Sequence, residues 1–141
     1  MKDYIYQSEY LKAFVEHDVI ISYWESSSEK MDMETFKENI TRFAQKAQEV
    51  IQTKSVSAIV DNSHQMRFAI SPSLQVWTVR TLTPLYKQFG IRKHALVMPQ
   101  SPISNMAYRQ IKEEYSTYKK SLKLERGYFD NLPEAKHWAK N

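Results

Sequence analysis

Three residue types that take part in hydrolysis and proton transfer stand close together in this chain. Asp61, Ser63 and His64 follow one another within a few positions, directly after an apolar run that ends at Asp61. A carboxylate there could act as a general base, and serine, histidine and aspartate together make the triad of serine hydrolases. Hydrolases with a nucleophile elbow hold the serine between glycines, and no glycine flanks Ser63. The pattern therefore favours Asp61 as a loop residue that accepts backbone hydrogen bonds, and we predict no catalytic residue.

A pair of serines forms a second candidate site. Ser71 directly precedes Pro72, and proline is favoured at the first helical position because its missing N–H is not needed there. The pair predicts that Ser71 is the N-cap of a helix. A phosphate at this place would also be stabilised by the helix N-terminus, so Ser71 is a candidate phosphoacceptor. Ser63 and Ser73 are weaker candidates for the same role.

Composition excludes several other classes of site. The chain has no cysteine, which excludes disulfides, thiolate zinc sites and cysteine nucleophiles. It has only two glycines, so neither a P-loop nor a dinucleotide-binding glycine motif is present. Its four histidines lack the spacing of metal ligands. We therefore predict neither a metal nor a cofactor.

Aromatic residues offer a further candidate site. Tyr23, Trp24 and Trp77 could line a pocket for an apolar ligand. Packing between a sheet and its helices is the more common role for such side chains.

Charge is distributed unevenly along the chain. Residues 1–50 hold 6 Lys and Arg against 10 Asp and Glu, a net −4, while residues 51–141 hold 14 against 6, a net +8. Such a division could mark an anion-binding face, or an acidic patch that meets a basic one across a dimer. No block of five like charges occurs, which favours ordinary solvated helix faces.

Basic side chains accumulate around Tyr115 and Tyr118, a composition that can serve nucleic-acid or acidic-lipid binding. Glutamates dilute this cluster, and the tyrosine spacing is typical of a core-facing helix stripe. We predict no nucleic-acid partner. The basic residues are Arg109, Lys112, Lys119, Lys120, Lys123 and Arg126.

The sequence predicts a cytoplasmic protein. Its first residues include acidic and polar side chains where a signal peptide would be apolar. The longest apolar runs are about five residues, against roughly 20 needed to span a bilayer. We therefore predict no membrane span.

Strands must position these residues. Alternating apolar side chains predict a hairpin that turns at Glu16-His17-Asp18, preceded by a short edge strand. Apolar runs bounded by polar residues predict interior strands. Residues 66–70 fit either a brief strand or an extended loop. The predicted strands cover residues 4–6, the hairpin 11–24, and residues 56–60, 94–98 and 122–125.

Helices alternate with these strands. Apolar residues recur at three- and four-residue spacing from Met33 to Ile51, which predicts a helix over residues 33–53 with Asp32 as its N-cap. A second helix begins at Ser71-Pro72 and ends at Gly90, and a third begins at Ser101-Pro102. Asn131 and Glu134 have the spacing of a capping box ahead of a last helix.

This order of elements predicts a single α/β domain over residues 1–141. Strands that alternate with helices need crossover connections, so the later strands are parallel and helices cover the sheet. The initial hairpin adds an antiparallel part. We expect a mixed sheet of about five strands with helices packed on it.

Four residue patterns, together with this order, resemble the SpoIIAA-like proteins. These belong to the STAS group (sulfate transporter and anti-sigma-factor antagonist) and are often grouped with Sec14-like domains. The resemblance covers nearly the whole chain and implies a STAS-like fold. The patterns are Ala58-Ile59-Val60-Asp61, the Trp77 helix that leads to Phe89-Gly90-Ile91, the strand Ala95-Leu96-Val97-Met98, and a tail with Phe129-Asp130, Glu134-Ala135 and Trp138.

The resemblance implies a non-enzymatic regulatory or protein-interaction module. In anti-sigma-factor antagonists of this group a partner kinase phosphorylates a serine, in an Asp-Ser-Ser-Gly context, at the start of a helix. The equivalent stretch here reads Ile70-Ser71-Pro72-Ser73, without the aspartate and the glycine. A kinase or another regulator is the implied partner, with the stretch from Asp61 to Ser71 as its contact surface. A homodimer is also consistent with the sequence.

Two alternatives stay open at this point. Sec14-like relatives imply a small-molecule or lipid-binding module, whose pocket would include Trp77, Tyr23 and Trp24. An enzyme of uncharacterised activity is the third hypothesis, and it would need titratable groups that converge in a cleft.

Overall fold

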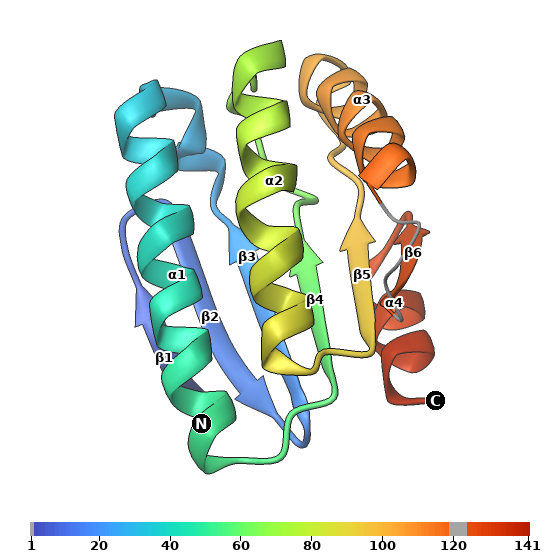
Figure 1. Cartoon of the computed structure of the whole chain (residues 1–141). Coiled ribbons are helices and arrows are strands. Elements are labelled where there is room, and N and C mark those ends of the chain that lie inside the picture. Colours follow the sequence, from blue (N-terminus) through green and yellow to red (C-terminus); the bar gives the residue numbers. More distant parts are fainter. Residues whose placement is uncertain (1, 119–123) are drawn as a thin grey trace.

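Six strands in one sheet, four α-helices and one 3-10 helix make up the part of the chain that the computed structural model describes, residues 2–118 and 124–141 (Figure 1). In chain order the elements are β1 (Asp3–Gln7), β2 (Leu11–Glu16), β3 (Val19–Trp24), η1 (Ser26–Lys30), α1 (Met33–Thr53), β4 (Ala58–Asn62), α2 (Pro72–Phe89), β5 (Lys93–Val97), α3 (Pro102–Tyr118), β6 (Glu125–Phe129) and α4 (Leu132–Lys140).

The order of strands in the sheet is the order of strands in the chain. β1, β2 and β3 pair antiparallel, and His17 supplies the left-handed residue (φ 57°) of the tight turn between β2 and β3. From β3 to β6 every pair is parallel. The carboxyl ends of these four strands therefore lie at one edge of the sheet, which we name the carboxyl edge.

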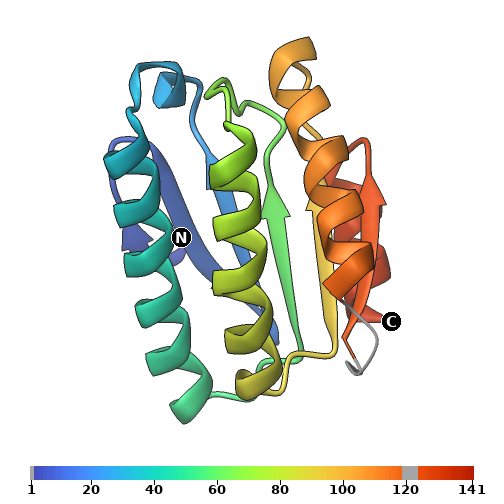
Figure 2. The same ribbon diagram turned by 45° about the horizontal axis from the view of Figure 1, so that its top comes forward.

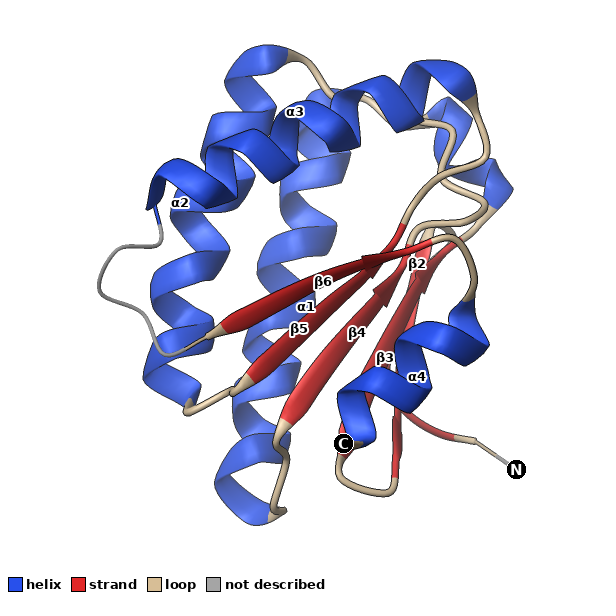
Figure 3. Ribbon diagram, turned by 90° about the vertical axis from the view of Figure 1, so that its right-hand side faces the viewer, coloured by secondary structure: helices blue, strands red, loops and turns tan. Residues whose placement is uncertain are grey.

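Helices cover the two faces of the sheet unequally. α1, α2 and α3 lie side by side on one face (Figure 2), while α4 lies alone on the other and contacts β4, β5 and β6 (Figure 3). Each face has its own buried core, because side chains alternate between faces along a strand. The larger core includes Leu11, Ile20, Ile59, Leu74 and Tyr86; the smaller includes Phe14, Val19, Val60, Ala95 and Ala135.

Capping residues set the helix ends where the sequence predicts them. The side chains of Asp32, Ser71 and Asn131 accept backbone N–H groups of the first turns of α1, α2 and α4. Gly90 ends α2 with φ at 79°, and its N–H and that of Ile91 satisfy carbonyls of the last turn. The helix predicted over residues 33–53 has those bounds in the structure.

The predicted α/β domain with a mixed sheet is confirmed. The sixth strand is β1, which corresponds to the edge strand predicted at residues 4–6. The last strand lies later than predicted: β6 spans Glu125–Phe129, and residues 122 and 123 of the predicted strand lie outside the described residues. Gly127 interrupts the apolar alternation of β6, which hides it in the sequence. Residues 66–70 form a loop.

No helix in residues 2–118 or 124–141 is both long enough and apolar enough to cross a bilayer. The cytoplasmic location stays a prediction.

Replacing Gly90 tests the turn that joins α2 to β5. A Cβ at this position would meet no atom within 4 Å, so the cost of Gly90→Ala is that of the left-handed backbone alone. We expect the free energy of unfolding to fall by about 1–2 kcal/mol in denaturant titration. Gly90→Asn should cost less, because asparagine tolerates this conformation. Equal stability of both variants and the unaltered chain would contradict the assignment.

Candidate functional site

A chain of hydrogen bonds crosses four neighbouring strands on the face covered by α1, α2 and α3. The Ser22 hydroxyl of β3 donates to Oδ1 of Asp61 on β4 at 2.6 Å. Oδ2 of Asp61 lies 2.6 Å from Nε2 of His94 on β5. Arg126 of β6 donates from Nε to Nδ1 of His94 at 3.2 Å, and from Nη2 to Oγ1 of Thr83 on α2 at 3.2 Å. We call these five residues the buried polar chain.

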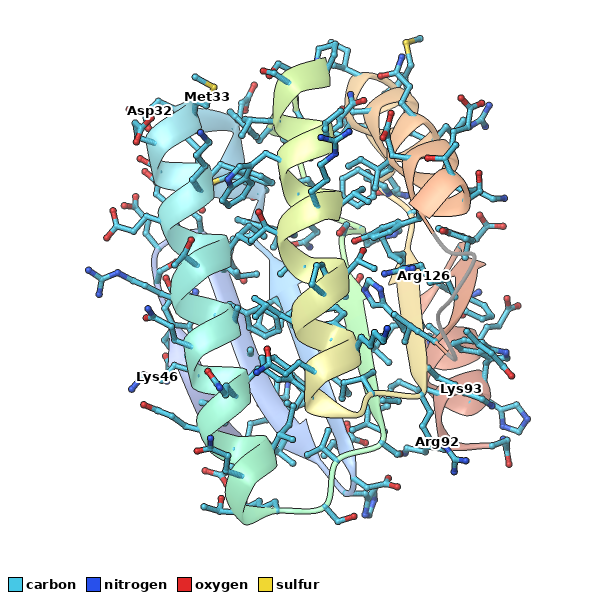
Figure 4. The ribbon with its side chains drawn as sticks, viewed as in Figure 1. Asp32, Met33, Lys46, Arg92, Lys93 and Arg126 are labelled. Atoms are coloured by element: carbon cyan, nitrogen blue, oxygen red, sulfur yellow. The ribbon has the colours of Figure 1, made fainter. Side chains whose placement is uncertain are left out.

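Strand register brings these side chains together. In parallel strands, paired residues point to the same face, as do residues two apart on one strand. Ser22 pairs with Asp61, and Arg126 pairs with His94. His94 pairs with Ile59, two residues before Asp61 on β4. All four strand residues therefore point under the helices, as Figure 4 shows for Arg126.

Hydrogen bonding fixes the protonation of His94. Arg126 is always a donor, so Nδ1 of His94 must be the acceptor and the ring proton sits on Nε2, where it is donated to Asp61. Burial lowers the pKa of His94 from its usual value, against the opposing pull of Asp61. The imidazole is thus neutral, and it joins the carboxylate of Asp61 to the guanidinium of Arg126. The guanidinium also stacks on Tyr115, 3.6 Å from the ring centroid.

This arrangement does not match a nucleophilic triad. In a triad the serine donates to the imidazole, whereas Ser22 donates to the carboxylate. Both ring nitrogens of His94 have protein partners, and the ring is fully buried. The buried polar chain can hold charges in a fixed geometry, but none of its groups is free to attack or deprotonate a substrate.

A cavity of about 40 Å³ adjoins the buried polar chain, between the sheet and the three helices. Sites for small organic ligands usually enclose roughly 300–1,000 Å³. Its polar lining includes Ser22, Asp61, Ser63, Tyr86 and Tyr108, and the apolar lining includes Leu11, Trp24, Phe36, Ile40, Phe43, Ile70, Leu82, Leu96 and Ile111.

Ser63 lies inside the protein beside this cavity. Its hydroxyl donates to Oη of Tyr108 at 2.8 Å, and both side chains are buried. Burial raises the pKa of Tyr108, so that hydroxyl stays protonated. Asp61 and Ser63 are therefore near one cavity, whereas His64 lines a hollow at the carboxyl edge.

Ser71 and Ser73 lie at the start of α2. Oγ of Ser71 accepts the N–H of Leu74 at 3.4 Å and is 3.3 Å from Oγ of Ser73. Ser73 is exposed and Ser71 is half-buried. The capping role predicted for Ser71 is confirmed, and phosphorylation of either serine stays a prediction.

The three aromatic residues predicted to line a pocket lie in different places. Trp24 is buried, stacks on Phe36 with ring centroids 5.5 Å apart, and lines the cavity. Tyr23 points to the opposite face of the sheet, where its hydroxyl is 3.0 Å from that of Tyr4; burial and this contact raise its pKa to about 12. Trp77 packs at the margin of the larger core, with the Lys37 ammonium 5.5 Å from its ring centroid.

His94 and Arg126 are the residues that sequence reasoning missed. Arg126 counted only as part of a basic cluster, three of whose members, Lys119, Lys120 and Lys123, lie outside the described residues. One signal in the sequence could have indicated that Asp61 and His94 meet. Asp61 is the last residue of one apolar run and His94 is the first residue of the next, and these two runs form neighbouring strands. Within the described residues, no group of three or more His, Asp or Glu side chains is placed to hold a metal.

Comparisons of the chain with protein-family models, with curated proteins and with solved structures gave no match. A function for this chain must therefore be inferred from its own residues and their geometry.

Acid titration tests the neutral state of His94. Because its folded pKa is depressed, the unfolded chain binds a proton below about pH 6.5 that the folded protein does not, and stability falls as the pH falls. We expect His94 to contribute a slope of up to about 1.4 kcal/mol per pH unit between pH 6.5 and its folded pKa. His94→Gln should reduce the slope, as measured by denaturant unfolding at several pH values. His17→Asn, in the exposed turn, should keep it.

A second prediction concerns the cap of α2. Ser71→Ala removes the acceptor for the N–H of Leu74 and should lower the free energy of unfolding by about 1 kcal/mol. Ser73→Ala should change it by less than about 0.5 kcal/mol, because the side chain is exposed. Thermal or denaturant unfolding of the two variants makes the comparison. A larger loss for Ser73→Ala would contradict this assignment.

Proposed function

We propose that the protein is a non-enzymatic interaction module that binds a protein partner through its carboxyl edge. The resemblance to SpoIIAA-like proteins supports this proposal, as does the sheet, in which a hairpin is followed by parallel βαβ units. In such sheets, binding surfaces form outside the carboxyl ends of the strands.

Exposed apolar side chains at this edge carry the proposal. Ile103 and Met106, in the first turns of α3, are 67% and 65% exposed, and Met33, the first residue of α1, is 46% exposed. Among the described residues these are the large hydrophobic side chains that stand out into solvent. Methionine is adaptable and common at protein contact surfaces. Figure 4 shows Met33 at the carboxyl edge.

A polar hollow lies beside Ile103. It encloses about 670 Å³ between η1 and the start of α3, and the loop of residues 64–69 contributes to its lining. Ile103 contributes an apolar side chain to the lining of this hollow, while Glu29, His64 and Arg67 contribute charged and polar groups. Apolar side chains next to a polar rim are typical of protein–protein interfaces.

The enclosure of the acid–base groups supports the non-enzymatic part of the proposal. Asp61 and His94 are bonded to each other and to neighbouring protein groups inside the larger core. The hollow at the carboxyl edge is lined by neither of them. A substrate bound there would meet His64 but not the buried polar chain.

Site-specific photo-crosslinking in the cells that make this protein tests the proposal. A benzophenone side chain at Ile103 should give a discrete crosslinked product, identified by mass spectrometry. The same group at Lys46, an exposed position in the middle of α1, is the matched control and should give none. If the product forms equally from both positions, or from neither, the carboxyl edge is not the contact surface.

A paired variant separates binding from folding. Met106→Asp should suppress the crosslink from Ile103, because it places a charge in the apolar part of the surface. Its unfolding free energy should stay within about 0.5 kcal/mol of the unaltered chain, because Met106 is exposed. A crosslink to a second copy of the chain would show that the partner is another copy and that the protein forms a homodimer.

A further inference from the structure

The cavity beside the buried polar chain contains two polar groups with unused bonding capacity. The hydroxyl of Tyr86 is fully buried, and among the described residues it has no hydrogen-bond partner. Burial raises the pKa of Tyr86 well above its usual value, so this hydroxyl carries a proton to donate.

Asp61 supplies the complementary acceptor. Its carboxylate has about four lone-pair sites, and Ser22 and His94 use one on each oxygen. The side chain keeps 17% of its surface exposed, and Asp61 lines the cavity. Tyr86 lines the same cavity. A donor and an acceptor thus border one small space without bonding to each other.

We propose that this cavity is a binding site for a hydroxyl group, which accepts a hydrogen bond from Tyr86 and donates one to Asp61. A hydroxyl carries both functions on one atom. An ammonium group could donate to Asp61 but could not accept from Tyr86. It would also add a positive charge, although Asp61 is already balanced through His94 by Arg126.

Size restricts the source of this hydroxyl. A cavity of about 40 Å³ holds a few water molecules, since one needs roughly 10–15 Å³. The remaining wall is apolar, formed by side chains such as Leu11, Phe36 and Leu82, and would accept a short carbon chain. The hydroxyl group therefore belongs either to a water molecule or to a small aliphatic alcohol.

A high-resolution crystal structure of the full chain tests the proposal directly. We expect density within hydrogen-bond distance of both Oη of Tyr86 and a carboxylate oxygen of Asp61. Mass spectrometry of the extract from denatured protein separates the sources: an alcohol should appear in the extract, whereas water leaves no organic product. Either result supports the site.

Two variants assign that density to its partners. Tyr86→Phe should abolish the density, because it removes the donor while keeping the ring. Thr78→Val is the matched control: Thr78 lines the same cavity but donates its hydroxyl proton to the carbonyl of Leu74, so the density should persist. If Tyr86→Phe fails to fold, nuclear Overhauser transfer from water or alcohol protons to lining residues of the unaltered chain gives the same answer.

Three findings would overturn the proposal. The first is a cavity without density in a well-ordered crystal. The second is a Tyr86 hydroxyl bonded to another group of the protein. The third is a cation at Asp61. None of these findings concerns the carboxyl edge, so they leave the proposal of a protein partner to be tested separately by crosslinking.

Discussion

A half-buried carboxylate under three helices constrains the sheet from β3 to β6. An isolated charge in such a place is costly unless it is paired and fully hydrogen-bonded. Asp61 is paired because His94 and Arg126 extend the hydrogen bonding across two further strands, and Ser22 donates to its other oxygen. β6 is thereby tied to the sheet by a side chain as well as by its backbone ladder. Removing any member leaves its neighbours unsatisfied, so this set of contacts adds to the backbone ladders in holding the register of four strands.

The protein separates its reactive side chains from its exposed surface. His94 lies in the interior, where its ring proton on Nε2 is donated to the carboxylate of Asp61. The apolar side chains that project into solvent lie instead at the first turns of α1 and α3. An interior of fixed charges and an edge with adaptable apolar residues suit a scaffold that presents a surface. This is the physical basis for favouring recognition over catalysis.

Sequence reasoning succeeded where the determinants are local. The periodicity from Met33 onward and the caps at Asp32, Ser71 and Asn131 depend on neighbours within one or two turns, and each is confirmed. It failed where determinants are distant. The contact between Asp61 and His94 spans 33 residues and depends on how two strands are aligned, which no single segment encodes.

The identity of strand order and chain order has a consequence for how the molecule is made. Each strand pairs with the strand just before it, and a crossover that contains a helix joins each of the parallel pairs. The sheet can grow one βα unit at a time as the ribosome delivers the chain. The chain then turns back, and α4 packs over β4 and β5. α4 follows all six strands in the described chain and covers the face of the sheet that α1, α2 and α3 leave open.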